Sequence, residues 1–434
     1  MNNAQLEEAS KRKFNMKIYP IYITFAYDFL FFYAVKVMFM SEVCGFTNSE
    51  IVFLVTVYSI ATVFFQFFAT IVIALIGNKN SAFLGNTLLM IFIILLMTTK
   101  NYGLIMLGEI FAAFGYGLKN NCEMMMLLQS IPAEDTVEKN KIFSKIDRKG
   151  YTRFCILSAL SAILSGWLYN INPYFPFAMT LICLLFAMLI LLNFYDFEHK
   201  TKTLSKKQIK EEFRNLKKGY KLTIKSKRLR ALILFVGLIL SISVLLTTYE
   251  MVLLQFLEVS AGLLGTLYAA FEASKGIFAK QTFKIEKKLR NRTLKTLLGI
   301  LAGSFILMGV IVIIDIEIHL KVSLIVAILI IDSGICGMSE ILNKKYLNNF
   351  SNEKISPAIY SSMQTIRGLF RILTTFIGSF ILKFTEIDYA FLIFGFILVI
   401  LSIFISNYAD GKLGLRPEQY GESDNFNKKT KIEN

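Results

Sequence analysis

The feature that most constrains this 434-residue chain is its series of apolar runs, each about 20 residues long, separated by polar segments. A helix of about 20 residues spans the hydrocarbon core of a bilayer. Lipid offers the backbone no hydrogen-bond partner, so such runs must be helical. We therefore predict an all-α integral membrane protein with twelve transmembrane helices. The predicted spans are residues 18–40, 51–76, 82–99, 103–129, 151–170, 175–195, 231–254, 261–282, 294–314, 322–343, 359–382 and 388–407.

The positions of the basic residues predict the orientation of these spans. With the N-terminus in the cytosol, the cytosolic segments hold 39 of the 47 Lys and Arg residues, and only Lys100, Lys321 and Lys383 lie outside. This asymmetry follows the positive-inside rule, so both termini are expected in the cytosol of a multi-pass protein of the plasma membrane. The net charge of +16 then faces the anionic inner leaflet and indicates no nucleic-acid partner.

The longest polar segment, residues 196–230, divides the spans six and six. Within it, apolar residues recur at helical spacing among Lys and Arg, which predicts an amphipathic helix on the inner leaflet. These apolar residues are Ile209, Phe213, Leu216 and Tyr220. We expect two pseudo-symmetric six-helix bundles, residues 1–195 and 231–408, joined by this linker, with a cytosolic tail at 409–434.

The sequence lacks the residue patterns of a metal site, a redox site and a nucleotide-binding site. The five cysteines are scattered without a Cys-x-x-Cys pair, and both histidines, His199 and His319, lie in connections between spans. No glycine-rich phosphate loop of the Gly-x-x-x-x-Gly-Lys type is present. We therefore expect no catalytic residues, no metal site and no cofactor, which leaves an ion gradient as the energy source.

The distribution of ionisable residues inside the spans repeats every three spans. Such residues are costly in a bilayer and usually face a bundle interior or a watery cavity. Spans 1, 4, 7 and 10 each carry at least one, whereas the cores of spans 3, 6, 9 and 12 carry none. The candidates for a polar cavity are Asp28, Lys36, Gln66, Glu109, Asp332 and Arg371.

This arrangement resembles the major facilitator superfamily, in which the first helices of four triplets line a central cavity. The loop after span 8, KIEKKLRNR, resembles the family's basic loop motif through Glu286, Lys287, Lys288 and Arg292. The stretches GEIFAAFGYGLKNNCE and GICGMSEILNKKYLNN look similar to a little-described bacterial branch. Ala74 and Arg290 depart from the loop motif, and the helix-4 and helix-5 motifs of the drug antiporters are absent.

The resemblance implies a secondary transporter that works by alternating access on a small polar or charged solute. Proton coupling is the expected energy source, and a monomer is the expected state. The alternative is a non-transporting membrane sensor or immunity protein that keeps the same fold. Solute flux in vesicles would distinguish the two.

Asp28 is the leading candidate for the coupling proton, because a lone carboxylate in the run FAYDFLFFYAVK is costly to desolvate. The alternative is a carboxylate permanently paired with a cation or hydroxyl. Lys36 lies two turns further on and is expected to bind solute, to pair with Glu109 or to snorkel to the interface. Arg371 is expected near Asp332 or an anionic solute.

Charged residues near the cytosolic ends of the spans predict a latch. Glu340 with Arg367, and Glu123 with Arg153, lie at comparable depths in the two halves. Two further pairs stand three or four residues apart on one helix and are expected to pair within it. These are Lys119 with Glu123 and Glu272 with Lys275.

Overall fold

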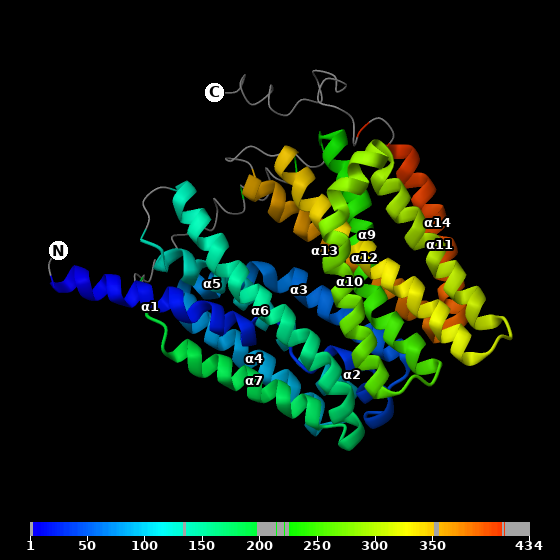
Figure 1. Ribbon diagram of the computed structural model, residues 1–434, viewed down its shortest axis with the longest axis horizontal. Helices are drawn as coiled ribbons and strands as arrows, with labels where there is room; N and C mark the ends of the chain where they lie inside the picture. The colour runs from blue at the N-terminus through cyan, green and yellow to red at the C-terminus, as the bar shows by residue number, and fades with distance from the viewer. Residues whose placement is uncertain are drawn as a thin grey trace. The chain divides into compact units, whose positions relative to one another are not determined.

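The computed structural model describes residues 3–132, 136–197, 214, 221, 225–350, 356–409 and 412. Within these ranges every regular element is a helix, which confirms the all-α prediction (Figure 1). The elements are α1 (Asn3–Ala26), α2 (Tyr33–Met38), the π-helix η1 (Phe39–Val43), α3 (Asn48–Ile76), α4 (Asn78–Thr98), α5 (Tyr102–Ser130), α6 (Thr136–Ile171), α7 (Phe175–Leu192), α9 (Lys227–Phe256), α10 (Ala261–Leu289), the 3₁₀ turn η2 (Arg290–Arg292), α11 (Thr293–Ile313), α12 (Ile318–Phe350), α13 (Ser356–Phe384) and α14 (Ile387–Ala409).

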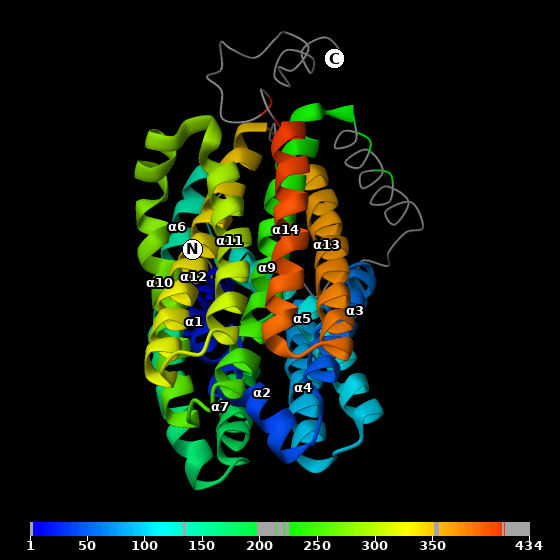
Figure 2. The same cartoon turned by 90° about the vertical axis from the view of Figure 1, so that its right-hand side faces the viewer.

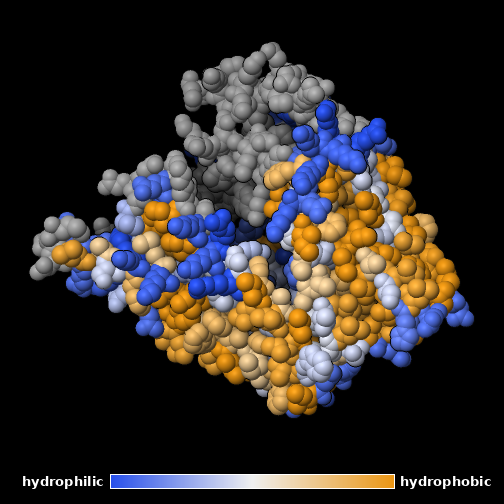
Figure 3. Space-filling model, in the orientation of Figure 1, coloured by the Kyte–Doolittle hydropathy of each residue, from blue (hydrophilic) through white to orange (hydrophobic). Residues whose placement is uncertain are grey.

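Nine helices in the described ranges are long and apolar enough to cross a membrane. Large apolar side chains cover much of the surface in Figure 3, and Trp167 and Phe404 are 64% and 70% exposed, as expected of a protein that faces lipid. The other three predicted spans lie in α1 with α2, in α5 and in α10, and these helices carry Lys36, Glu109 and Lys275. The nine helices are consistent with twelve spans, and that number stays a prediction.

The first predicted span is not one continuous helix, so this prediction is wrong. α1 ends at Ala26, α2 begins at Tyr33, and the intervening Phe31 has a φ of +63°. The backbone N–H of Phe29 donates to Oδ1 of Asp28 at 2.7 Å. An aspartate that bonds a nearby backbone N–H competes with the helical ladder, which accounts for the break at this position.

Neighbouring helices satisfy backbone groups that the break releases. The Lys119 ammonium of α5 donates to the carbonyl of Ala26, the last residue of α1. Thr180 of α7 donates its hydroxyl to the carbonyl of Leu30 at 2.7 Å. Because an unpaired backbone group is costly inside a membrane protein, these contacts stabilise the non-helical segment 27–32.

The described helices group into two compact units. The first comprises Met1–Phe46, Val57–Ser205 and Ser260–Ala269. In it α1 packs on α6 and α7, and α4 packs closely on α5. A Cβ atom added to Gly115 would lie 2.7 Å from the carbonyl oxygen of Gly85, so α5 can approach α4 at this point only without a side chain.

The second unit comprises Thr47–Thr56, Lys206–Val259 and Ala270–Asn434. Most side chains of α9 are buried, because α11, α12, α13 and α14 all pack against this helix. α11 and α14 run side by side (Figure 2). Ser49 and Ser379 each donate a hydroxyl to the other's carbonyl, at 2.8 and 2.9 Å, which ties the start of α3 to α13 inside this unit.

The predicted boundaries at 196–230 and 409–434 stay predictions, since the two units draw on segments from both sides of residue 196. The predicted amphipathic helix with Ile209, Phe213, Leu216 and Tyr220 lies outside the described residues, as does His199. The predicted cytosolic tail, 409–434, lies outside them as well, except for Ala409 and Lys412.

Candidate functional site

Asp28 lies in the break between α1 and α2, with its two carboxylate oxygens in different environments. Oδ1 accepts the Phe29 N–H and the Tyr33 hydroxyl, each at 2.7 Å, together with the hydroxyl of Tyr116 from α5. Within the described part of the chain, Oδ2 accepts no hydrogen bond, and the side chain is only partly buried. The carboxylate is therefore fixed in place by one oxygen and has the other available.

Two tyrosines donate to this carboxylate, and each lies beside a further tyrosine of the first unit; we call the four the tyrosine cluster. They are Tyr33, Tyr58, Tyr116 and Tyr268. The rings of Tyr33 and Tyr268 stack with centroids 6.3 Å apart and planes inclined by 12°, and those of Tyr58 and Tyr116 lie 6.5 Å apart. All four side chains are partly exposed. They come from α2, α3, α5 and α10, so the break in the first span assembles groups from distant parts of the sequence.

The tyrosine cluster is not predictable as a whole from the sequence. Tyr33 stands five residues after Asp28, which is a usable local signal. The other three are single tyrosines in apolar runs, where an aromatic residue is ordinary packing material. Their meeting with Asp28 and Tyr33 in one cluster depends on how the helices pack.

Lys119 and Glu123 do not form the predicted intrahelical pair. Lys119 is 1% exposed and reaches the carbonyl of Ala26 instead. The C-terminal end of a helix carries partial negative charge, so it offers a favourable partner to an ammonium group. Glu123 accepts the hydroxyl of Tyr22 at 2.7 Å.

Lys36 and Glu109 form an ion pair between α2 and α5, with Nζ and Oε1 2.8 Å apart. The side chains are 17% and 3% exposed, and the Lys36 ammonium lies 5.3 Å from the ring centroid of Phe32. Of the three arrangements expected for Lys36, the structure shows the pair with Glu109. Such a buried pair leaves neither charge uncompensated.

In the second unit, Asp332 of α12 is fully buried. Its Oδ2 accepts the hydroxyl of Ser304 at 2.6 Å, while its Oδ1 has no hydrogen-bond partner among the described residues. Glu250 of α9 is 2% exposed and lies within electrostatic range of Asp332 and Lys275. Lys275 pairs with Glu272 at 2.5 Å, which confirms the pair predicted for α10.

The structure brings one of the two predicted latch pairs together. Arg367 Nη2 lies 3.9 Å from Glu340 Oε1, a long contact between side chains that are 30% and 57% exposed. In the described part of the chain, Glu123 and Arg153 form no ion pair, since Glu123 is buried against Tyr22 and Arg153 is exposed.

The remaining predicted site residues lie on two helices. Gln66 of α3 is partly exposed in the first unit. Arg371 of α13 is partly exposed in the second unit, where its carbonyl accepts the Thr375 hydroxyl at 2.8 Å. Among the described residues, no three His, Cys, Asp or Glu side chains gather as metal ligands.

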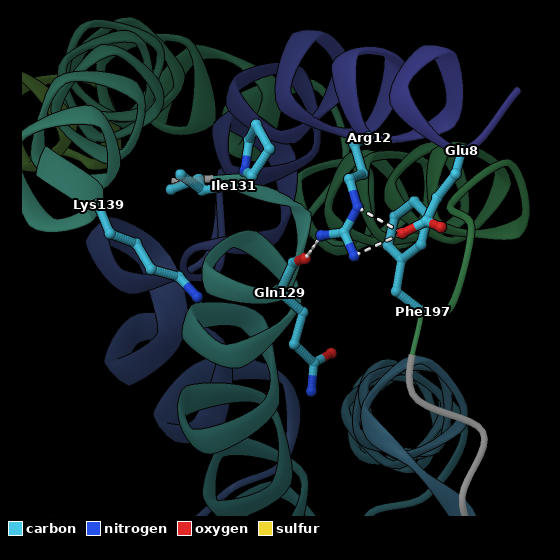
Figure 4. Close-up of a pocket in the computed structure, with 7 residues that line it drawn as sticks. Glu8, Arg12, Gln129, Ile131, Lys139 and Phe197 are labelled. Carbon is cyan, nitrogen blue, oxygen red and sulfur yellow. Dashed lines mark hydrogen bonds and ion pairs between the residues drawn. The ribbon is translucent and has the colours of Figure 1, made fainter. Parts of the chain in front are cut away.

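A separate pocket of about 520 Å³ lies between the start of α1 and the end of α5. The Arg12 guanidinium in this pocket is bound by other residues of the protein (Figure 4). It pairs with Glu8 at 2.8 Å and donates to the Gln129 carbonyl. It also lies 4.5 Å from the Phe197 ring centroid. The pocket contains none of the predicted site residues. Arg12 instead ties the N-terminal helix to the end of α5.

Comparisons with known proteins agree with this architecture. The model of the Major Facilitator Superfamily matches residues 18–375. No curated protein sequence matches the chain. The solved structure of the nucleoside transporter NupG is similar with a TM-score of 0.67 at 13% identity, over 92% of this chain and 99% of that one. A D-xylose-proton symporter gives 0.63 at 13% over 90% and 97%, and a POT family transporter in complex with 5-aminolevulinic acid gives 0.61 at 15% over 91% and 95%. Identities this low establish the fold alone, whereas the family model covers most of the sequence. The chain belongs to the major facilitator superfamily, and it is a membrane transporter, not an enzyme.

Proposed function

We propose that this protein is a proton-coupled secondary active transporter that moves a small polar or charged solute across the plasma membrane by alternating access. The observation that carries the proposal is the Asp28 carboxylate, which has three donors on Oδ1 and an available Oδ2. Family membership and the fold shared with a D-xylose-proton symporter support it.

Asp28 suits a proton carrier for a physical reason. Three donors keep the carboxylate in one orientation, and a proton on Oδ2 removes its charge without disturbing those contacts. A neutral acid can be enclosed within the membrane at much lower cost than an anion. Loading a proton would therefore favour a conformation in which this site is closed to water.

The other predicted residues take their roles within the same proposal. Both termini are cytosolic, the active form is a monomer, and the energy source is the proton gradient. The halves 1–195 and 231–408 move about the solute. Solute binding or coupling involves Lys36, Gln66, Glu109, Asp332 and Arg371, and the cytosolic latch is formed by Glu340 with Arg367.

Proton flux in proteoliposomes tests the proposal. Purified protein is reconstituted with a trapped pH-sensitive dye, a pH gradient is imposed, and nucleosides, sugars, peptides, amino acids and organic cations are added in turn. Solute-dependent proton movement is expected for the natural chain and is lost in Asp28→Asn.

Asp388→Asn is the matched control, because Asp388 also accepts the next residue's N–H at 2.7 Å but lies at the start of α14. Full proton flux in Asp28→Asn would refute the role of Asp28. A natural chain that moved no solute from any class would instead favour the non-transporting alternative.

A further inference from the structure

We infer that the solute carries an organic cation, such as an ammonium group, which binds Oδ2 of Asp28 in exchange for the proton and lies against the tyrosine cluster. This inference rests on the proposed function and names the solute class of the same site. Asp28 and the tyrosine cluster all lie in the first unit.

The hydrogen bonds of Asp28 leave an anionic oxygen suited to a cation. Oδ1 accepts three donors, from Phe29, Tyr33 and Tyr116, whereas Oδ2 accepts none from the described residues. A polar solute that offers a charged donor would complete the coordination of the carboxylate. A hydrogen bond to a charged group is stronger than one between neutral groups, so an ammonium group is favoured over a neutral hydroxyl.

The tyrosine cluster suits the same kind of ligand. Aromatic rings attract cations through their electron-rich faces, and cages of such rings recognise ammonium groups. Two of the four tyrosines, Tyr33 and Tyr116, also donate their hydroxyls to Asp28. Phe29 lies beside both, with ring centroids 6.3 Å from Tyr33 and 5.6 Å from Tyr116. The site therefore combines one anionic oxygen with several aromatic rings.

The basic side chains near Asp28 are engaged elsewhere. The Lys36 ammonium pairs with Glu109, and the Lys119 ammonium donates to the carbonyl of Ala26. Neither ammonium group is available to bind an anionic solute. The negative charge of Asp28 would also repel such a solute. These contacts argue against recognition of a carboxylate or phosphate at this position.

The charged groups on the elements around Asp28 lie mainly on α2, α5 and α6. α7 has no acidic or basic residue, and the parts of α3 and α10 in this unit have none. The charged residues of the neighbouring elements are Lys36 on α2, Glu109, Lys119 and Glu123 on α5, and Asp147, Arg148, Lys149 and Arg153 among those of α6. Tyr33 and Tyr116 are the hydroxyls that donate to the carboxylate. We assign the exchanged proton to Asp28, because its Oδ2 lies on the carboxylate that these two rings hold.

The exchange balances in charge and atoms. The protonated acid is neutral, and it releases its proton from Oδ2 to water. The resulting carboxylate takes up the cation, which again gives a neutral pair. One proton thus moves against one cation, and the transmembrane cycle is an electroneutral antiport.

Binding of matched probes to the purified full-length protein tests this inference without a gradient. The cations are benzylammonium and ethanolammonium, whose N–H groups can donate to Oδ2. Their neutral carbon analogues are ethylbenzene and 1-propanol, and benzylsulfonate is the anion. We expect at least one cation to bind by calorimetry about tenfold or more tightly than its neutral analogue. Equal binding of cation and analogue, tighter binding of benzylsulfonate, or no binding of either cation would overturn the inference.

Variants assign the binding to the site. Asp28→Asn is expected to weaken the cation about tenfold or more, whereas Asp388→Asn leaves it unchanged. Tyr268→Phe keeps the ring and should change affinity less than about twofold, and Tyr268→Leu should weaken it about 2- to 30-fold. An unchanged thermal unfolding curve without ligand shows that each variant is folded. Equal cation affinity in Tyr268→Phe and Tyr268→Leu would refute a contribution of this aromatic ring to binding.

Proton competition supplies a second readout. Raising the pH from acid to neutral should tighten cation binding to the natural chain, because fewer protons compete for Oδ2. Asp28→Asn should show no such dependence. If neutral solutes drive proton flux that requires Asp28, the cation inference fails while the proposed function stands. If Asp28→Asn keeps full flux, the proposed function fails.

Discussion

The ion pair between Lys36 and Glu109 allows a quantitative test of how this fold tolerates buried charge. Glu109 is 3% exposed, and its carboxylate lies 2.8 Å from the Lys36 ammonium. In Lys36→Met the carboxylate stays buried without its partner, so the free energy of unfolding should fall by about 3–5 kcal/mol. The double variant Lys36→Met with Glu109→Leu removes both charges and should recover most of that loss, because apolar residues of similar volume often replace a buried pair at little cost.

Reversible unfolding in mixed micelles, followed by circular dichroism, measures these differences. The control is Lys11→Met, which breaks the pair of Lys11 with Glu7 outside the predicted spans; these side chains are 38% and 68% exposed. Because solvent screens that pair, the control should change the free energy of unfolding far less than Lys36→Met does. The reasoning is refuted if Lys36→Met costs no more than the control, or if the double variant is as unstable as the single one.

Further predictions concern the break, the helix contacts and the N-terminal helix. Lys119→Met leaves the carbonyl of Ala26 without its charged donor and should lower the free energy of unfolding by about 1.5–3 kcal/mol, which the same unfolding assay measures; an unchanged curve would contradict the role of this contact. Gly115→Val should cost about 1–3 kcal/mol, because a Cβ there meets the carbonyl of α4 at 2.7 Å, whereas a stable variant would show that the helices can separate freely. A hydrogen bond and the positive charge of Lys11 hold the pKa of Glu7 below its ordinary value. This stabilisation is present above the unfolded pKa and is lost as the pH falls through the folded one, so an NMR titration of Lys11→Met should show a higher pKa of Glu7, and an unshifted one would disprove the contact.

Local properties of the sequence were enough to predict the class of fold and several site residues. Apolar runs about 20 residues long require helices in lipid, whatever their neighbours are. Charged residues such as Asp28, Lys36 and Glu109 stand out within those runs, because each is costly unless it is compensated. For the same reason, the pairing of Lys36 with Glu109 could be anticipated from their similar depth.

The partners of Lys119 and Glu123 could not be read from spacing. Two oppositely charged residues four apart on a helix are close enough to pair. A contact with another helix replaces that pair when it supplies a hydrogen bond to a buried polar group that has no other partner. The carbonyl of Ala26 at the end of α1 is such a group, and Tyr22 offers Glu123 a buried hydroxyl. The sequence shows neither, because each depends on where α1 ends.

By itself, the sequence determined that this chain is a helical membrane protein and that Asp28 is a carboxylate set among apolar residues. Only the tertiary structure decided that the first span breaks at residues 27–32, that one oxygen of Asp28 accepts three donors, and that Tyr58 and Tyr268 lie beside the tyrosines that bind it. The physical reason is the distance along the chain between the residues that interact. Hydropathy and charge act on each segment alone, whereas the break is stabilised by donors from α5 and α7, and the cluster forms only when four elements pack together.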